Sequence, residues 1–251
     1  MSQRKPLVAG NWKMNCLKAD AVALAEGIAS RYEALADKKC DVLVCPPSIL
    51  ILPVVDAVKG RVFVGAQDAH ASSFGAHTGD IAVEMIKDAG CSFVIVGHSE
   101  RRTDHDETNA CVKAKAEKII ADGLKAVICI GETLQQRDAG KTIDVCREQI
   151  QGSVPATANA DNVVIAYEPV WAIGTGKTPT TKDVQDVHAA VRAEIEALLG
   201  KETAEKMRIL YGGSVKPSNA KELMALKDVD GALVGGASLK VDDFWAIIEA
   251  C

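Results

Sequence analysis

Short runs of β-branched and other apolar residues recur along the chain at intervals of roughly 30 residues, and helix-like segments follow them. Strands that alternate with helices in this way are typical of successive βα units, in which a helix joins two parallel strands. The repeat therefore predicts an α/β fold. Eight strands are expected, at residues 7–10, 41–45, 62–67, 93–97, 126–130, 163–167, 208–211 and 231–234.

Amphipathic segments rich in Ala, Glu, Lys and Leu lie between the predicted strands, the clearest at residues 18–35, 108–121, 183–199 and 219–226. No linker, low-complexity tract or long charge run divides the 251 residues. Eight units can form an open sheet, but closure leaves no exposed edge strand. We predict a single catalytic domain over residues 1–251, a (β/α)8 TIM barrel with eight parallel strands.

Charge and cysteine content argue against several classes of protein. The net charge of −5 forms no basic stripe for nucleic acid, and no apolar run is long enough to span a bilayer. The N-terminal segment lacks a secretory apolar core, so we expect a cytoplasmic protein. The eight cysteines contain no C-x-x-C and the five histidines no metal-site spacing. We expect buried, reduced thiols and no metal.

Polar, titratable and glycine residues gather directly after the predicted strands, where the active sites of barrel enzymes lie. Because the C-terminal ends of the strands share one rim, we expect five loops to converge on one mouth. The residues concerned are Asn11 and Lys13 after the first strand, His98 after the fourth, Glu168 after the sixth, Gly212 to Ser214 after the seventh, and Gly235 and Gly236 after the eighth.

Glu168 on its own is most simply read as a structural carboxylate at the end of a strand. The segment that follows it, residues 170–178, is apolar in its first half and rich in glycine in its second half. Such a segment suits a lid that excludes water and still hinges. We interpret Glu168 as a base that moves a proton beneath this lid.

The glycines favour a phosphate site over a nucleotide site. Residues 174–178 are similar to the end of a P-loop, but Trp171 stands where that motif requires its first glycine. Pro179 likewise breaks the dinucleotide-binding pattern. Glycine pairs after the seventh and eighth strands allow backbone amides to approach an anion, as barrel phosphate sites do.

Lys13 and His98 supply the remaining chemistry. An ammonium group at the mouth would balance phosphate charge and the charge of a developing enolate. His98 begins a predicted helix, whose positive dipole end disfavours protonation of the imidazole. A neutral imidazole opposite Glu168 would polarise a carbonyl and move protons between two neighbouring oxygens.

These loops resemble the triosephosphate isomerase family over essentially the whole chain, in the family's order and spacing. The matching motifs are Asn-Trp-Lys-Met-Asn at 11–15, Gly-His-Ser-Glu-Arg-Arg at 97–102, Cys-Ile-Gly-Glu at 129–132, Ala-Tyr-Glu-Pro-Val-Trp-Ala-Ile-Gly-Thr-Gly at 166–176, Tyr-Gly-Gly-Ser at 211–214 and Leu-Val-Gly-Gly at 233–236.

The resemblance implies interconversion of dihydroxyacetone phosphate and D-glyceraldehyde 3-phosphate through a cis-enediolate, without metal or organic cofactor. It implies that Glu168 is the base, that neutral His98 moves protons between the oxygens, and that Lys13 stabilises charge. It also implies that Asn11 orients the substrate and that backbone amides hold the phosphate, those of Gly174, Ser214, Gly235 and Gly236.

The remaining implied roles concern the lid. Ser99 is expected to hold Glu168 while the lid is open, and Ile173 and Leu233 to press on Glu168 once the lid closes. Glu100 and Tyr211 are expected to support the site.

The resemblance further implies a homodimer in which the loop at 67–80 inserts beside the partner's active site. Thr78 is then expected to contact Asn11 and Lys13 of the partner subunit. The chain departs from the family at Asp80, where a glutamate usually pairs with Arg101 of the partner subunit, so this pair must reach further or be bridged by water.

Two further departures concern the loops beside the mouth. His105 and Asp106 replace the usual aromatic and small residues. Pro179 stands where the family's tyrosine, here Tyr211, meets a backbone amide, and proline has no N–H to donate. We therefore hypothesise that the closed lid is latched mainly through Ser214 and Gly176.

Two alternatives remain open on the residues alone. Another phosphate-binding barrel isomerase would share the glycines but gives no reason for Lys13, His98 and Glu168 together. A catalytically silent barrel that acts as a binding protein would be favoured by loss of a catalytic residue, and none is lost.

Overall fold

The computed structural model describes residues 4–173 and 179–251, and all eight predicted strands form within one residue of their expected ends. They are β1 (Leu7–Asn11), β2 (Asp41–Cys45), β3 (Phe63–Ala66), β4 (Phe93–Val96), β5 (Lys125–Ile130), β6 (Val163–Tyr167), β7 (Ile209–Tyr211) and β8 (Gly231–Val234).

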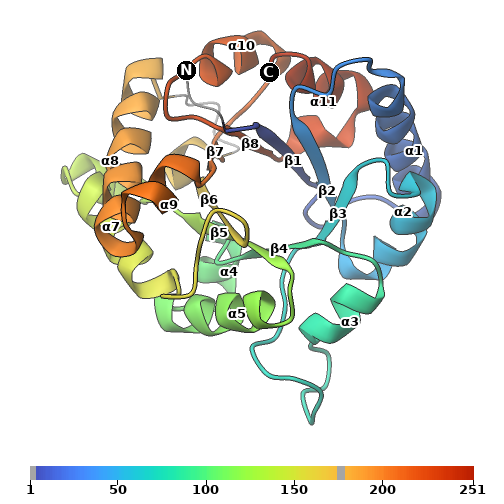
Figure 1. The fold of residues 1–251 in the computed structure, drawn as a ribbon, viewed down its shortest axis with the longest axis horizontal. Helices are drawn as coiled ribbons and strands as arrows, with labels where there is room; N and C mark the ends of the chain where they lie inside the picture. Colours follow the sequence, from blue (N-terminus) through green and yellow to red (C-terminus); the bar gives the residue numbers. More distant parts are fainter. Residues whose placement is uncertain (1–3, 174–178) are drawn as a thin grey trace.

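The strands pair in parallel in chain order, and β8 returns to β1 to close a barrel. At this seam Leu7 is opposite Gly231 and Gly10 is opposite Val234. Figure 1 shows the strands at the centre and the helices as a surrounding ring. The predicted closed TIM barrel is confirmed.

The helices cover the outer face of the barrel, and some of them begin at a side-chain cap. Thr108 accepts a hydrogen bond from Cys111 N before α5, and Thr180 and Asp183 form a capping box at α8. No helix of the described residues is long and apolar enough to cross a membrane. The α-helices are α1 (Lys18–Ala34), α2 (Ile51–Val58), α3 (Val83–Asp88), α4 (Ser99–Asp104), α5 (Asn109–Ala121), α6 (Leu134–Asp138), α7 (Thr142–Ser153), α8 (Thr181–Leu199), α9 (Lys201–Lys206), α10 (Pro217–Met224) and α11 (Val241–Ile248).

Three short 3-10 helices complete the described elements, at η1 (Ser48–Leu50), η2 (Val170–Ala172) and η3 (Gly236–Leu239). The helices predicted at 18–35, 108–121, 183–199 and 219–226 correspond to α1, α5, α8 and α10, with ends shifted by one or two residues.

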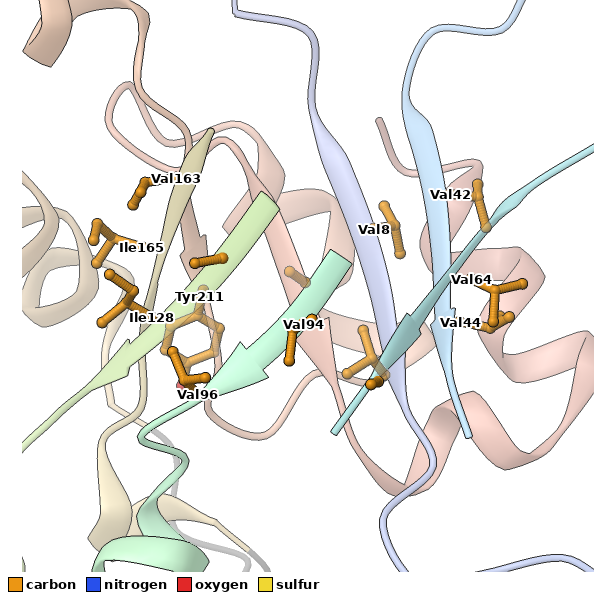
Figure 2. Packing of buried hydrophobic residues seen from close by; sticks show 14 of the residues in the cluster. Val8, Val42, Val44, Val64, Val94, Val96, Ile128, Val163, Ile165 and Tyr211 are labelled. Carbon is orange, nitrogen blue, oxygen red and sulfur yellow. The ribbon is translucent and has the colours of Figure 1, made fainter. Parts of the chain in front are cut away.

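Side chains of successive strand residues alternate between two buried layers. Along β6, Val164 and Ala166 belong to the cluster inside the barrel, whereas Val163 and Ile165 belong to the larger cluster between strands and helices. Figure 2 shows part of this outer layer, in which valine and isoleucine side chains project from neighbouring strands. Both strand faces are therefore apolar, as the near-continuous hydrophobic runs predicted.

His188 of α8 is a fully buried histidine of this outer layer, packed beside the rings of Tyr167 and Tyr211. Its Nδ1 lies 3.1 Å from the carbonyl oxygen of Asp228 and donates to it, while Nε2 has no hydrogen-bond partner among the described residues. Burial lowers the pKa of His188 to about 4. The folded state therefore keeps the imidazole neutral.

We expect the free energy of unfolding to fall as the pH drops from the ordinary histidine pKa towards 4, because the unfolded chain binds a proton that folded His188 does not. The loss should reach about 3 kcal/mol at the acid end. Urea unfolding at several pH values measures it. In His188→Gln, which keeps a donor but does not titrate, this part of the pH dependence should vanish; an unchanged slope would contradict the assignment.

Candidate active site

The inward-facing side of the strands continues into the mouth of the barrel. Ala166 of β6 faces the interior of the barrel, and Glu168, two residues later, is on the same side of the chain. Asn11 stands in the same relation to Ala9 of β1. Because alternate residues of a strand share one face, both polar side chains reach the same opening.

A cavity of about 330 Å³ lies at this opening and collects most of the predicted site residues. The predicted residues that line it are Asn11, Lys13, His98, Glu168, Ile173, Ser214, Leu233, Gly235 and Gly236. Ser99, Glu100, Tyr211 and Thr78 are not among its lining residues, although Glu100 lines a neighbouring cavity of about 530 Å³ that shares Asn11, Lys13 and His98. Gly174 and Gly176 lie outside the described residues.

Glu168 is buried, with 2% of its surface exposed, and each carboxylate oxygen has a donor. Oε1 lies 2.8 Å from Nε2 of His98, and Oε2 accepts a hydrogen bond of 3.1 Å from the backbone N–H of Ser99. Ser99 thus contacts Glu168 through its main chain. Burial of a carboxylate is tolerated because both oxygens are hydrogen-bonded.

His98 is the N-cap of α4. Its Nδ1 accepts a hydrogen bond of 3.2 Å from the backbone N–H of Glu100, so Nδ1 carries no proton and Nε2 donates to Glu168. A neutral imidazole with its proton on Nε2 satisfies both contacts.

The helix terminus does not set the pKa of His98 alone. Burial lowers the pKa, but the charge and hydrogen bond of Glu168, with a contribution from Glu100, raise it above its ordinary value. The expectation that the helix N-terminus controls protonation here was incomplete, because the carboxylate lies only 2.8 Å away.

Lys13 is held in a conformation that side chains rarely adopt, with a φ of 51°. The Asn11 side chain accepts from its backbone N–H at 3.0 Å, and the Gln67 amide donates to its carbonyl at 2.8 Å. These bonds place Nζ at the mouth, 2.5 Å from Oε1 of Glu100. A strained backbone held by neighbours is common at functional sites.

The far wall of the cavity consists of two glycine-rich segments. Gly212, Gly213 and Ser214 follow β7, and Gly235 and Gly236 follow β8, where η3 begins. No atom lies within 4 Å of the position that a Cβ of Gly236 would occupy, so its main chain is open on that side. Exposed amides at the start of a helical turn suit an anion.

Sequence reasoning missed that two glycines lie so close to Glu168 that a larger residue would not fit at either position. A Cβ on Gly131 would lie 1.7 Å from the carbonyl oxygen of Glu168, and one on Gly212 would lie 2.8 Å from its Cγ. It also missed Gln67, which anchors Lys13. Gln67 is a polar residue directly after a strand, which is the signal that identified Asn11 and Glu168.

Glu132 anchors the first half of the predicted lid, and sequence reasoning missed this role as well. It is fully buried and accepts hydrogen bonds from Tyr167 Oη at 3.0 Å and from Trp171 Nε1 at 2.8 Å. The guanidinium of Arg137 stacks on the Trp171 ring at 4.3 Å. The apolar part of the segment is thus fixed to the barrel at its start.

The structure gives local contacts or backbone angles for some of the positions at which the chain departs from the family's pattern. Asp106 has a φ of 52°, which a small residue such as glycine adopts most easily. Arg101 forms ion pairs within the chain, at 2.9 Å to Asp68 and 2.6 Å to Glu107. Tyr211 is buried, and the latch hypothesis for Pro179 stays a prediction because it involves Gly176.

Within the described residues, one group of three side chains brings metal-type ligand atoms within 4.8 Å of one another: His70, His77 and Asp80. They lie on the loop after β3, and none lines the cavity around Glu168. Nδ1 of His70 already accepts the Ser72 N–H at 3.0 Å, which leaves the proton on Nε2, the atom nearest to Asp80. Metal binding through Nε2 would require that proton to move.

Comparison with known proteins gives one consistent result. The triosephosphate isomerase family model matches residues 6–251. A triosephosphate isomerase from Bradyrhizobium diazoefficiens is 55% identical over 251 residues, and one from Rhodopseudomonas palustris is 56% identical over 250, each alignment covering 98% of both chains. The crystal structure of triosephosphate isomerase from Bartonella henselae superposes with a TM-score of 0.90 at 42% identity, covering 98% of each chain.

The close contact between Gly212 and Glu168 leads to a test of the site geometry. A methyl group in Gly212→Ala would lie 2.8 Å from Cγ of Glu168 and would push the carboxylate from its position. We expect turnover to fall by about a hundredfold, since small displacements of a reacting group are costly. Steady-state kinetics and a thermal unfolding scan measure this; full activity in a folded variant would show that Glu168 is not held by this contact.

Proposed function

The chain belongs to the triosephosphate isomerase family, and we propose that Glu168, His98 and Lys13 carry out the isomerisation of dihydroxyacetone phosphate and D-glyceraldehyde 3-phosphate that this membership assigns to it. The observation that supports these roles best is the contact of 2.8 Å between Glu168 Oε1 and His98 Nε2. It brings a carboxylate and an imidazole side by side in a cavity of about 330 Å³, which supports the roles of base and proton donor.

Glu168 acts as the general base. With substrate bound, its carboxylate removes a proton from the carbon beside the carbonyl, and the electron pair of that C–H bond forms the carbon–carbon double bond of a cis-enediolate. The same carboxyl group returns the proton to the neighbouring carbon. Its burial excludes competing water, and Ile173 and Leu233 form the apolar part of the cavity around it.

His98 supplies the proton that the substrate oxygen needs as negative charge develops there. Its Nδ1 is held as an acceptor by the Glu100 N–H, so the proton of Nε2 points towards the Glu168 side of the cavity. A substrate oxygen that replaces Glu168 Oε1 as acceptor receives this hydrogen bond. The imidazole then moves protons between the two neighbouring oxygens.

Lys13 and the glycine segments bind the charged groups. The side chain of Lys13 passes beside Gly235, since its Cε lies 3.7 Å from the position of a Cβ on that glycine. Backbone amides of Ser214, Gly235 and Gly236 are proposed to hold the phosphate, and Asn11 to orient the substrate. Gly174 completes this set by resemblance to the family alone.

The proposed roles are tested by Glu168→Gln, which keeps size and hydrogen-bonding capacity but cannot remove a proton. We expect its kcat to fall by about a thousandfold, the typical contribution of a general base. The measurement is a coupled assay with D-glyceraldehyde 3-phosphate. Glu196→Gln, a change on the exposed face of α8, is the control and should keep parental activity. Equal rates for Glu168→Gln and the parent would reject the assignment and favour a silent barrel.

We further propose that the chain forms a homodimer through the loop at residues 67–80. This loop extends beyond the ring of helices in Figure 1, and its Phe74 is 66% exposed. Met14, which is 95% exposed, lines two cavities beside the base of the loop. Exposed apolar side chains around a protruding loop and a concave surface are typical of an interface.

Thr78→Arg tests the dimer, because Thr78 is exposed on this loop and is proposed to contact Lys13 of the partner subunit. The new positive charge should repel that lysine and dissociate the dimer. We expect monomers by sedimentation velocity and a loss of kcat of at least about tenfold. Thr157→Arg, at an exposed threonine before β6, is the control. A monomeric parent with full activity would contradict the proposal.

Two further proposals concern the domain organisation and the cellular location of the protein. We propose that residues 1–251 form one catalytic domain, because the barrel is closed by strands drawn from Leu7 to Val234 and the family model spans residues 6–251. We also propose a cytoplasmic location, since glycolysis is the role that the family implies and the described cysteines are free thiols.

A further inference from the structure

Two cysteines that the isomerase site does not use meet at the opposite end of the barrel. Cys40 directly precedes β2, whereas the cavity around Glu168 lies after the strands. Cys40 is 3% exposed, and its Sγ lies 3.8 Å from the carbonyl oxygen of Ile248. Its own carbonyl accepts a hydrogen bond of 2.8 Å from Tyr32 Oη, which fixes the main chain at this point.

Cys251 reaches the same place from the other end of the chain. It follows α11, and its backbone N–H donates to the carbonyl oxygen of Ile248 at 3.3 Å. Cys40 and Cys251 therefore converge on one acceptor atom, although 210 residues separate them in the sequence. Their two thiols are neighbours that influence each other's protonation, and Cys251 is partly exposed while Cys40 is buried.

The direction of the pKa shifts favours Cys40 as the nucleophile of the pair. The neighbouring Cys251 thiol lowers the pKa of the Cys40 thiol and outweighs the effect of burial. Of the charges nearby, Asp41 raises this pKa, and the Lys5 ammonium, which pairs with Asp41 at 2.8 Å, lowers it. The same contact raises the pKa of Cys251. A thiolate beside a second thiol is the arrangement found where disulfides form reversibly.

The other buried cysteines lack this arrangement. Cys45 and Cys129 lie inside the barrel, and burial raises the pKa of each thiol well above its usual value. Cys91 and Cys146 are buried among apolar side chains, and burial likewise raises the pKa of each thiol, to about 12 for Cys91. These thiols stay protonated and shielded, so they are poor competitors for an oxidant.

We propose that Cys40 and Cys251 form a redox modification site, in which a small hydroperoxide joins them by a disulfide. The Cys40 thiolate attacks the outer peroxide oxygen, the O–O bond breaks, and the alkoxide or hydroxide that leaves takes up a proton. Cys251 then attacks the sulfenic sulfur of Cys40, the S–O bond breaks, and water leaves. The two thiols lose two electrons, and the peroxide gains them.

The bond would act as a covalent clamp across the seam that closes the barrel. Cys40 leads into β2, Cys251 follows the helix after β8, and β1 lies between those strands and pairs with both. A link between these points limits the freedom of almost the whole unfolded chain, which favours the folded state. The cavity lies at the other ends of the strands, so catalysis should not change.

The test is exposure of the folded, reduced protein to hydrogen peroxide, followed by alkylation and mass spectrometry. We expect a loss of about 2 Da and one cross-linked peptide pair containing Cys40 and Cys251, reversed by dithiothreitol. The oxidised protein should unfold several degrees higher than the reduced protein, with kcat/KM unchanged.

Cys251→Ser and Cys40→Ser should each abolish the linkage, and the first changes only a partly exposed side chain, so it is expected to fold. Cys16→Ser, at a cysteine also partly exposed, is the matched control and should still form the bond. The proposal is overturned if peroxide oxidises Cys16 or Cys111 while Cys40 and Cys251 stay reduced, or if the link forms only after denaturation. A disulfide that lowers the unfolding temperature would reject the clamp.

Discussion

Closure of a parallel sheet on itself is the constraint on which the rest of this molecule depends. Every strand must bury one face inside the barrel and the other under helices, so alternate residues are committed to opposite layers. The alternation does not stop where the strands end. It points the side chains of Asn11 and Glu168 inward at the rim. The backbone hydrogen bond from Glu168 N to Ile130 O, at 2.7 Å, extends the pairing of β6 with β5 as far as Glu168. The site is the continuation of the core pattern into polar residues.

One turn of helix then organises the reactive groups. The first residues of α4 supply the N–H of Ser99 to Glu168 and the N–H of Glu100 to His98, while His98 and Glu168 contact each other directly. A buried carboxylate would be costly without these donors. The proton on His98 is directed because the helix start occupies the other ring nitrogen. Glu168 and His98 are thus oriented by the same few backbone amides.

The loop after β3 connects this site to the exposed surface. Gln67, at the start of the loop, bonds to the carbonyl oxygens of Lys13 and Cys45 at 2.8 and 2.9 Å and so supports the strained backbone of Lys13. Thr78 and Phe74 lie further along the same loop. In the proposed dimer, a segment anchored at one catalytic centre would therefore also complete the wall of its neighbour's, which gives a physical reason for activity to depend on assembly.

The sequence by itself determined the eight strands, the order of βα units and most of the site, because alternation, helical periodicity and residues at strand ends are local properties of the chain. Strand-end positions predicted that Glu168, His98 and Lys13 would share one mouth, and all three line one cavity. Only the tertiary structure decided which groups touch. The contact with Glu168 affects the pKa of His98 more than the helix start does. Gly131 and Gly212 leave room for Glu168, and Cys40 meets Cys251 across the barrel seam. These relations join residues that are distant in the chain, and closure of the barrel fixes them through distances and burial that no local pattern encodes.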